Sequence, residues 1–312
     1  MSIWNDMAWV PGLRTPFFNV FFETVTLMGY PLFLIMFLCF GYFVLGSKRF
    51  FHTAMLLIIA GLVNSWLKDI GQDPRPDASF ALDARTGTSY GWPSGHTQIA
   101  VVLWGYLAYT MQKKWAYWTA AIFIFLQAFS RLYLGVHDLG DVTAGFIIGA
   151  VMLYGFIALE NHARIGPGVA ALSMKQGAAL LIAWHAAYVL VYPAHEGHAA
   201  PYWFIGIMLG WYLGWLLVER REVELPGPWP VQGVIAAMMT GVCFYAMVLT
   251  TRFAGTIGQG EGVPAAVVDY AMGVVFGLFV ICALPCVLAL LQGKRPRLAM
   301  GHEDEDKNAH EE

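Results

Sequence analysis

Long apolar runs constrain the fold of this chain more than any other feature. A helix needs about 20 mostly apolar residues to cross a membrane. The segment Pro16–Leu27 places Phe beside polar residues at helical spacing and predicts an amphipathic N-terminal helix at the membrane interface. After it, an all-α polytopic bundle of about nine transmembrane helices is predicted, with spans at 28–45, 51–67, 97–111, 115–129, 142–159, 177–192, 202–218, 231–250 and 267–291.

Composition supports a membrane protein and excludes several other classes. Hydrophobic residues make up 58% of the 312 residues and charged residues 12%, against roughly 45–50% and 25% in soluble domains. These values exclude a disordered chain, a nucleic-acid binder with a basic face and almost any soluble enzyme of this size. A disulfide framework or zinc site is not expected, because no CxxC pair occurs and all four cysteines lie in apolar runs: Cys39, Cys243, Cys282 and Cys286.

The order of the apolar runs predicts four parts of the chain. They are an interfacial segment (1–27), a catalytic helical core (28–159), a C-terminal extension of four spans (160–297) and a disordered acidic tail (298–312). In the extension, Gly206, Gly210 and Gly214 repeat every four residues, which indicates close helix packing within the chain or between two chains. A homodimer through these spans is therefore left open.

Lysine and arginine predict the orientation, since they collect in cytoplasmic loops. With nine alternating spans, 12 of the 18 basic residues fall on the side that holds Lys48 and Arg49. We therefore expect a plasma or inner membrane protein with its N-terminus outside and its C-terminus in the cytoplasm.

The opposite face gathers polar residues in three clusters at the ends of spans. Lys68, Arg75 and Arg131 supply three cations there, with no nearby acid in the sequence able to neutralise all of them. Planar guanidiniums and an ammonium suit the oxygens of a phosphate. Ser94 and Gly95 open a helix whose free N–H groups and dipole also favour an anion. We therefore predict a phosphate site.

Two histidines and a carboxylate add chemistry to this anion site. Asp141 lies four residues after His137, which on a helix would place both on one face. A carboxylate that binds one ring nitrogen leaves the other as a nucleophile or base. His96 is then available as the general acid for the leaving oxygen.

Less specific interpretations were weighed against this one. A single Arg or Lys at a span end more often reaches toward lipid headgroups than takes part in catalysis. The polar segment 71–91 is predicted with equal weight to be a lid or a solvated connector. The His195-Glu196-Gly197-His198 sequence is a weak metal motif and favours a solvated loop.

The three clusters together resemble the signature motifs of the type-2 phosphatidic acid phosphatase superfamily, over about 16–159. The resemblance implies that His137 is a nucleophile that forms a phosphohistidine, that Asp141 orients it and that His96 protonates the leaving group. It implies a site at the outer membrane face without metal or cofactor, with phosphate bound by Lys68, Arg75, Ser94, Gly95 and Arg131. The matching segments are Lys68-x6-Arg75-Pro76, Pro93-Ser94-Gly95-His96 and Ser130-Arg131-x5-His137-x3-Asp141.

The predicted function is hydrolysis of a lipid phosphate or diphosphate, with membrane lipids around the protein and no nucleic acid as a partner. The outline of about nine spans departs from the six of many bacterial members and is similar to the glucose-6-phosphatase and sphingosine-phosphate phosphatase branches. Two alternatives stay open. One is a transporter or translocase that only binds phosphate headgroups, and the other is a phosphatase or phosphotransferase on a soluble substrate such as a sugar phosphate.

Overall fold

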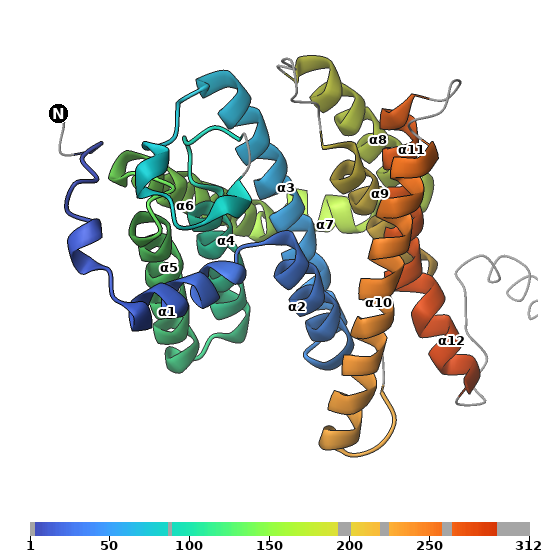
Figure 1. Cartoon of the computed structure of the whole chain (residues 1–312). Coiled ribbons are helices and arrows are strands. Elements are labelled where there is room, and N and C mark those ends of the chain that lie inside the picture. The colour runs from blue at the N-terminus through green and yellow to red at the C-terminus, as the bar shows by residue number, and fades with distance from the viewer. Residues whose placement is uncertain (1–3, 87–88, 193–200, 219–224, 258–263, 292–312) are drawn as a thin grey trace, which may run out of the picture. The chain divides into compact units, whose positions relative to one another are not determined.

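The computed structural model describes residues 4–86, 89–192, 201–218, 225–257 and 264–291, and every regular element in these ranges is helical (Figure 1). The predicted all-α class is therefore confirmed. The acidic tail and the His195–His198 sequence lie outside the described residues.

The helices are η1 (Pro11–Leu13), α1 (Pro16–Leu27), α2 (Pro31–Val44), α3 (Ser47–Gly71), η2 (Ala78–Phe80), η3 (Ala84–Thr86), α4 (Gly95–Met111), α5 (Lys114–Tyr133), α6 (Leu139–Asn161), α7 (Ile165–Ala170), α8 (Met174–Val191), α9 (Tyr202–Leu217), α10 (Trp229–Ile257), α11 (Ala265–Leu278), the π-helical turn η4 (Phe279–Ala283) and α12 (Leu284–Leu291).

Fewer helices than predicted are able to cross a membrane. Within the described ranges four helices are long and apolar enough, namely α3, α6, α10 and the continuous Ala265–Leu290, and the pair α1 and α2, bent by 58°, makes a fifth if it is one span. The prediction of nine spans is not supported. Helices α4 and α9 have only 17 and 16 residues, which is short for a membrane crossing. The last turns of α5 contain the buried polar residues Gln127, Ser130 and Arg131, so its apolar part is shorter than the helix.

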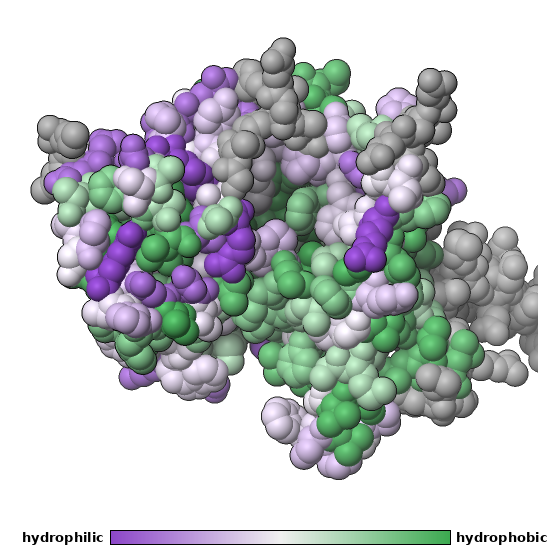
Figure 2. All heavy atoms as spheres, in the orientation of Figure 1, coloured by the Kyte–Doolittle hydropathy of each residue, from purple (hydrophilic) through white to green (hydrophobic). Residues whose placement is uncertain are grey.

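Several of these helices expose apolar side chains, as expected for an integral membrane protein. Figure 2 shows apolar surface on one face of the molecule. Large apolar side chains are at least half exposed along α6 and α10, an arrangement that water disfavours and lipid accepts. Examples are Ile147, Val151 and Tyr154 on α6, and Val234, Met238 and Tyr245 on α10.

The chain forms two compact units. The first contains 4–34, 53–170 and 191–192 among the described residues, and it holds every predicted site residue. The second contains 35–52, 171–190 and the described residues from 201 onward. The four-part division made from the sequence stays a prediction.

Helix α1 begins and ends where the sequence predicts. Thr15 caps its N-terminus by accepting a hydrogen bond from the Phe18 N–H, and Pro16 occupies the first turn, where no N–H is needed. Its buried face, which includes Phe22 and Thr26, packs on α5. The helix therefore brings Thr26 to Arg131 in the site. Its place at a membrane interface stays a prediction.

Close packing of α6 on α4 brings two of the predicted motifs together. A Cβ atom added at Gly145 would lie 2.5 Å from the carbonyl oxygen of Ser94, and one at Gly149 would lie 2.8 Å from that of Gln98. Because no side chain intervenes, the start of α4 lies directly against the first turns of α6. The Ser94 N–H donates to the carbonyl oxygen of Asp141 at 3.0 Å.

In the second unit, the glycine stripe of α9 packs on α11 of the same chain. Added Cβ atoms at Gly206 and Gly210 would each lie 2.1 Å from a carbonyl oxygen of α11, those of Tyr270 and Val274. The predicted close packing is therefore confirmed within the chain. A homodimer stays a prediction.

Candidate active site

The structure brings the three predicted motifs together in the first unit. Lys68 lies in the last turn of α3, Arg131 in the last turn of α5, and Asp141 in the first turn of α6. Ser94 is the N-cap residue of α4, so the predicted helix start at Gly95 is confirmed. The segment between α3 and α4, residues 72–94, carries Arg75 and is called the connecting segment below.

His137 is held at both ring nitrogens. Its Nδ1 lies 2.8 Å from Oδ2 of Asp141 and its Nε2 lies 3.2 Å from Nη1 of Arg75. The predicted His137–Asp141 contact is thus present, although the two residues do not share a helix as expected. Helix α6 begins at Leu139, so His137 precedes the N-cap residue Asp138.

The two partners of His137 decide where its proton lies. A guanidinium has donors only, so the contact with Arg75 is favourable when Nε2 carries a lone pair. Nδ1 then carries the proton and donates it to Asp141. Burial, followed by the positive charges of Arg131, Lys68 and Arg75, lowers the pKa of His137 well below its usual value. The ring is therefore neutral at neutral pH, with its lone pair on the side of Arg75.

Asp138 fixes the carboxylate that binds His137. Its Oδ1 accepts from the Asp141 N–H at 2.9 Å, and Oδ2 of Asp141 accepts from the Asp138 N–H at 3.4 Å, which is a capping box. Asn5 donates to the other Asp138 oxygen at 2.8 Å. The sequence analysis did not identify Asp138, although two acids three residues apart before an apolar run are the signal of such a cap.

Lys68 and Arg75 are held by the connecting segment. Lys68 donates to the carbonyl oxygens of Tyr90 and Gly91, the latter at 2.9 Å. Arg75 donates to the Ser89 carbonyl oxygen at 2.6 Å and to its Oγ at 3.1 Å. Burial and the nearby charge of Arg131 lower the pKa of Arg75 to about 10. Backbone oxygens thus fix both cations without adding a full negative charge.

Arg131 is the exception, because it forms a buried ion pair. Its Nη1 lies 3.1 Å from Oδ2 of Asp83, and both side chains are 1% exposed or less. The same Nη1 donates to Oγ1 of Thr26. Asp83 was not predicted from the sequence as a partner of these cations. No nearby acid was expected to neutralise all three of them, and Asp83 neutralises one, Arg131.

His96 and Arg131 each leave one buried nitrogen unpaired. Nε2 of His96 and Nε of Arg131 are buried and have no hydrogen-bond partner among the described residues. The ring of Tyr30 meets that of His96 edge-on, with centroids 4.6 Å apart. Because buried polar atoms are normally paired, these two donors are suited to an acceptor from a ligand.

Ser94 and Gly95 lie at the start of α4, where the neighbouring side chains of α3 and α4 form hydrogen bonds. Oγ of Ser94 is buried and accepts from the Thr97 hydroxyl at 3.1 Å. Asn64 of α3 donates to Oε1 of Gln98 at 2.9 Å, so these two polar residues form a hydrogen bond between α3 and α4. A Cβ atom at Gly95 would lie 2.8 Å from Oδ1 of Asn64, so only glycine fits without a shift.

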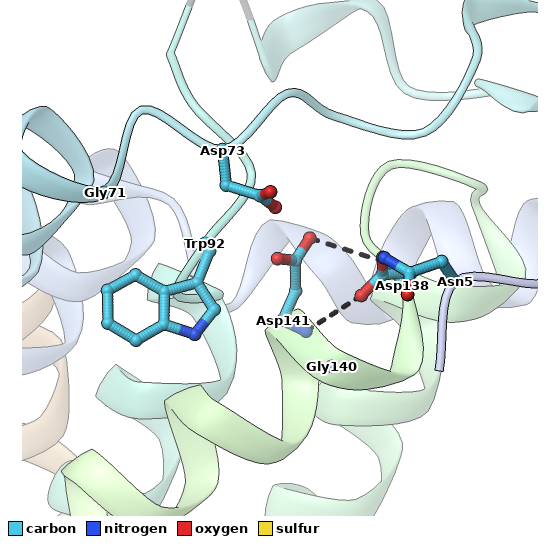
Figure 3. Close-up of a pocket in the computed structure, with 7 residues that line it drawn as sticks. All are labelled: Asn5, Gly71, Asp73, Trp92, Asp138, Gly140 and Asp141. Atoms are coloured by element: carbon cyan, nitrogen blue, oxygen red, sulfur yellow. Dashed lines mark hydrogen bonds between the residues drawn. The ribbon is translucent and has the colours of Figure 1, made fainter. Parts of the chain in front are cut away.

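A pocket of about 360 Å³ opens beside Asp141 (Figure 3). Figure 3 shows the carboxylates of Asp73, Asp138 and Asp141 gathered near the indole of Trp92. Burial raises the pKa of Asp73. Among the described residues no group of three metal-ligating side chains has the arrangement of a metal site.

The part of the chain that holds these residues is similar to known proteins. The model of the PAP2 superfamily matches residues 49–164. Phosphatidylglycerophosphatase B of Bacillus subtilis is 28% identical over 159 residues, which are 46% of this chain and 75% of that protein. Lipid A 4'-phosphatase of Bacteroides thetaiotaomicron is 27% identical over 175 residues, 49% of this chain and 76% of that protein.

One solved structure is also similar, the PAP2-type phosphatidylglycerolphosphate phosphatase of Bacillus subtilis. It is 25% identical, with a TM-score of 0.44 over 50% of this chain and 83% of that one. PAP2 phosphatases are a family of metal-independent phosphomonoesterases. The matched residues 49–164 include all three motifs, from Lys68 to Asp141. Over residues 49–164 the chain therefore matches the PAP2 superfamily, and in this region it is similar to membrane phosphatases.

Proposed function

We propose that this protein hydrolyses a lipid phosphate or lipid diphosphate through a phosphohistidine formed on His137. The observation that carries the proposal is the pair of contacts on the His137 ring, with Asp141 at Nδ1 and Arg75 at Nε2. The first contact orients the ring and the second marks the side on which an anion is attracted. A lone pair that faces a cation is placed to meet a phosphoryl group.

The reaction follows from this geometry in two steps. Nε2 of His137 attacks phosphorus, and the bond from phosphorus to the lipid oxygen breaks while His96 gives that oxygen a proton. Water then attacks the phosphohistidine, His96 takes its proton, and inorganic phosphate leaves. Asp141 stabilises the positive charge that develops on the His137 ring in the first step.

The cations stabilise the charge on the transferring phosphoryl group. Lys68, Arg75 and Arg131 are proposed to bind its oxygens, together with Ser94 and Gly95 at the N-terminus of α4. Phosphoryl transfer needs chiefly positioning and charge stabilisation. The unpaired Nε of Arg131 and Nε2 of His96 supply two donors for these oxygens or for the leaving group.

A lipid substrate is proposed because the helices that carry the site belong to a membrane protein and because both bacterial relatives are named for lipid substrates. Helix α3 has Lys48 and Arg49 in its first turn and Lys68 in its last, so this pair of basic residues favours the cytoplasm for the start of α3 and the extracytoplasmic face for the site. A reporter fused after Lys114 should then be cytoplasmic, and a periplasmic signal from it would overturn this orientation.

The contacts favour catalysis over the binding of a headgroup alone. A transporter that only binds phosphate uses the three cations, but it gains nothing from a carboxylate fixed on Nδ1 of His137. An imidazole oriented in this way, with a second histidine in the same site, is typical of nucleophilic and acid–base catalysis.

Phosphate release and phosphoenzyme formation test the proposal. The purified protein is given phosphatidic acid, phosphatidylglycerol phosphate, a prenyl diphosphate, a sphingoid phosphate and a sugar phosphate. We expect turnover of a lipid substrate and an acid-labile phosphoenzyme that His137→Ala abolishes. The control is His162→Ala, an exposed histidine beyond the end of α6 that should leave both unchanged. Phosphoenzyme in His137→Ala, or turnover of the sugar phosphate alone, would contradict the proposal.

A further inference from the structure

The connecting segment holds Arg131 by a different kind of contact from those that it makes with Lys68 and Arg75. Those two cations meet backbone carbonyl oxygens and a hydroxyl, whereas Arg131 meets the carboxylate of Asp83, which is 2% exposed. Asp83 lies 48 residues from Arg131 in the chain and outside all three motifs. A buried carboxylate beside a phosphate site repels the substrate, so its presence needs a reason.

Both oxygens of Asp83 are fully used. Oδ2 accepts from the Tyr30 hydroxyl at 2.6 Å and from Nη1 of Arg131 at 3.1 Å. Oδ1 accepts from Nε and the backbone N–H of Arg85, at 2.7 and 3.2 Å. Burial alone raises the pKa of Asp83, but the hydrogen bonds from Tyr30, Arg85 and Arg131 outweigh it and lower the pKa below its usual range. Asp83 is therefore ionised and fixed in place.

These contacts reach the two site residues that have an unpaired donor. Asp83 binds Nη1 of Arg131, whose Nε has no partner among the described residues. It also binds the hydroxyl of Tyr30, whose ring lies edge-on against His96, and Nε2 of His96 has no partner in the same part of the chain. One carboxylate thus restrains both Arg131 and the aromatic neighbour of His96.

We propose that Asp83 is a positioning residue, which aims the guanidinium of Arg131 at the phosphoryl group and, through Tyr30, holds the ring of His96 beside the leaving oxygen. This inference rests on the proposed function, because it assigns Arg131 and His96 to the substrate. An ion pair that is already formed in the ligand-free protein leaves Arg131 little freedom to lose when the transition state forms. Asp83 thus raises the reaction rate by orienting Arg131 and His96, while its negative charge weakens the attraction of the site for the phosphate group.

The Asp83→Asn variant should change the affinities for inorganic phosphate and for vanadate in opposite directions, because the first depends on charge and the second on the orientation of Arg131. The variant removes a negative charge, so inorganic phosphate should bind as tightly as before or up to about tenfold more tightly. Vanadate mimics the pentacoordinate transition state and needs a correctly aimed Arg131, so its affinity should fall about tenfold or more. With substrate, kcat should fall about 10- to 100-fold while KM changes less than about threefold.

A double-mutant cycle separates positioning from a general effect on folding. In an Arg131→Ala background, Asp83→Asn should lower kcat less than it does in the wild type and only about as much as Tyr30→Phe does, because the contact with Arg131 is already lost and only the contact with Tyr30 remains. Tyr30→Phe, which keeps the ring and removes the bond to Asp83, should show a smaller loss of kcat. Asp77→Asn is the matched control, since Asp77 is an exposed acid on the same segment whose carboxylate bonds only Ser79 among the described residues. It should leave kcat unchanged.

The anion measurements keep this inference distinct from the proposed function. Thermal shifts of the purified full chain with phosphate and with vanadate need no substrate. If the wild-type protein turns over no lipid phosphate, the proposed function fails, while the ratio of the two affinities still reports on Asp83. Equal loss of phosphate and vanadate affinity, an unchanged ratio, or an undiminished effect of Asp83→Asn in the Arg131→Ala background would each overturn the positioning role.

Discussion

Nε2 of His137 and Nη1 of Arg75 lie 3.2 Å apart, while Oδ2 of Asp141 lies 2.8 Å from the opposite ring nitrogen. The imidazole is thus held between a cation and an anion, and only one tautomer satisfies both contacts. That tautomer places a lone pair on the cationic side, where a phosphate is attracted. Under the proposed function, the phosphate must draw Arg75 away from this lone pair before Nε2 attacks phosphorus.

Asp141→Asn should keep phosphate binding and lose most of the rate. The amide removes the negative charge that stabilises the imidazolium character of the transition state, and its NH₂ group favours the wrong tautomer. We expect kcat to fall about 10²- to 10⁴-fold, with little change in the affinity for inorganic phosphate. Steady-state kinetics and a phosphate-induced thermal shift check this. A loss of less than about threefold would mean that Asp141 only stabilises the start of α6.

The two histidines should respond differently to the leaving group. His96→Ala removes the general acid, which an acidic phenol does not need, so activity on an aryl phosphate should partly recover relative to an alkyl phosphate. His137→Ala should stay inactive on both, since no group replaces the nucleophile. Turnover of both variants on matched alkyl and aryl phosphates checks this. Rescue of His137→Ala instead of His96→Ala would reverse the assigned roles.

Activity should persist in excess chelator and be inhibited by vanadate. The three cations of the site already supply the charge that a divalent metal provides elsewhere. Phosphate release is measured with and without a chelator such as EDTA, followed by added magnesium or zinc. Loss of activity that added metal restores would contradict this prediction and direct attention to the three carboxylates around the pocket beside Asp141.

The pH dependence of kcat/KM should reflect the lowered pKa of His137 and the positive charges of the site. His137 must be unprotonated to attack, so activity is lost as the pH falls through its pKa. Because that pKa is lowered, the acidic limb should lie below the usual value of about 6.5. The anion also needs the positive charges of the site, so a second loss of activity should occur at alkaline pH, where the Lys68 ammonium loses its proton before a guanidinium does.

The Arg75→Gln variant tests the assignment of the acidic limb. Removing a nearby positive charge raises the pKa of His137, so this limb should move to higher pH. An acidic limb that stays in place or moves to lower pH would show that a group other than His137 controls it.

The candidate site residues that are close in sequence could be predicted from local patterns. Contacts between residues far apart in the chain could not. The bounds of α1, the start of α4 after Ser94 and the contact of His137 with Asp141 depend on neighbouring residues, so their patterns are visible in the sequence. The Asp83–Arg131 pair joins residues 48 positions apart without any periodic signal. Only the fold of the connecting segment brings them together.

The number of spans was predicted less well, for a related reason. Hydropathy treats every apolar run as a membrane crossing, but α4 and α5 use part of their length for the site. Gln98, Gln127 and Arg131 are buried against other parts of the protein, so these helices need less apolar length. Burial by neighbouring helices replaces burial by lipid, and a single sequence does not distinguish the two.

A pair of glycine substitutions on α6 should separate the packing that supports the site from general effects on the helix. A Cβ atom at Gly145 would lie 2.5 Å from the backbone oxygen of Ser94, whereas one at Gly155 meets nothing within 4 Å. Gly155→Ala should leave stability unchanged or raise it by up to about 1 kcal/mol, since alanine favours the helix. Gly145→Ala should lower stability by about 1–3 kcal/mol, because backbone atoms must move apart.

The same pair should differ in activity. A shift of α6 from α4 lengthens the bond from the Ser94 N–H to the Asp141 carbonyl oxygen and moves the first turn of α6, which positions His137. We therefore expect Gly145→Ala to lose about tenfold or more in kcat and Gly155→Ala to retain wild-type kinetics. Thermal unfolding in detergent and steady-state kinetics of both variants check this. Equal behaviour of the two variants would show that the close approach of α6 to α4 does not set the geometry of the catalytic residues.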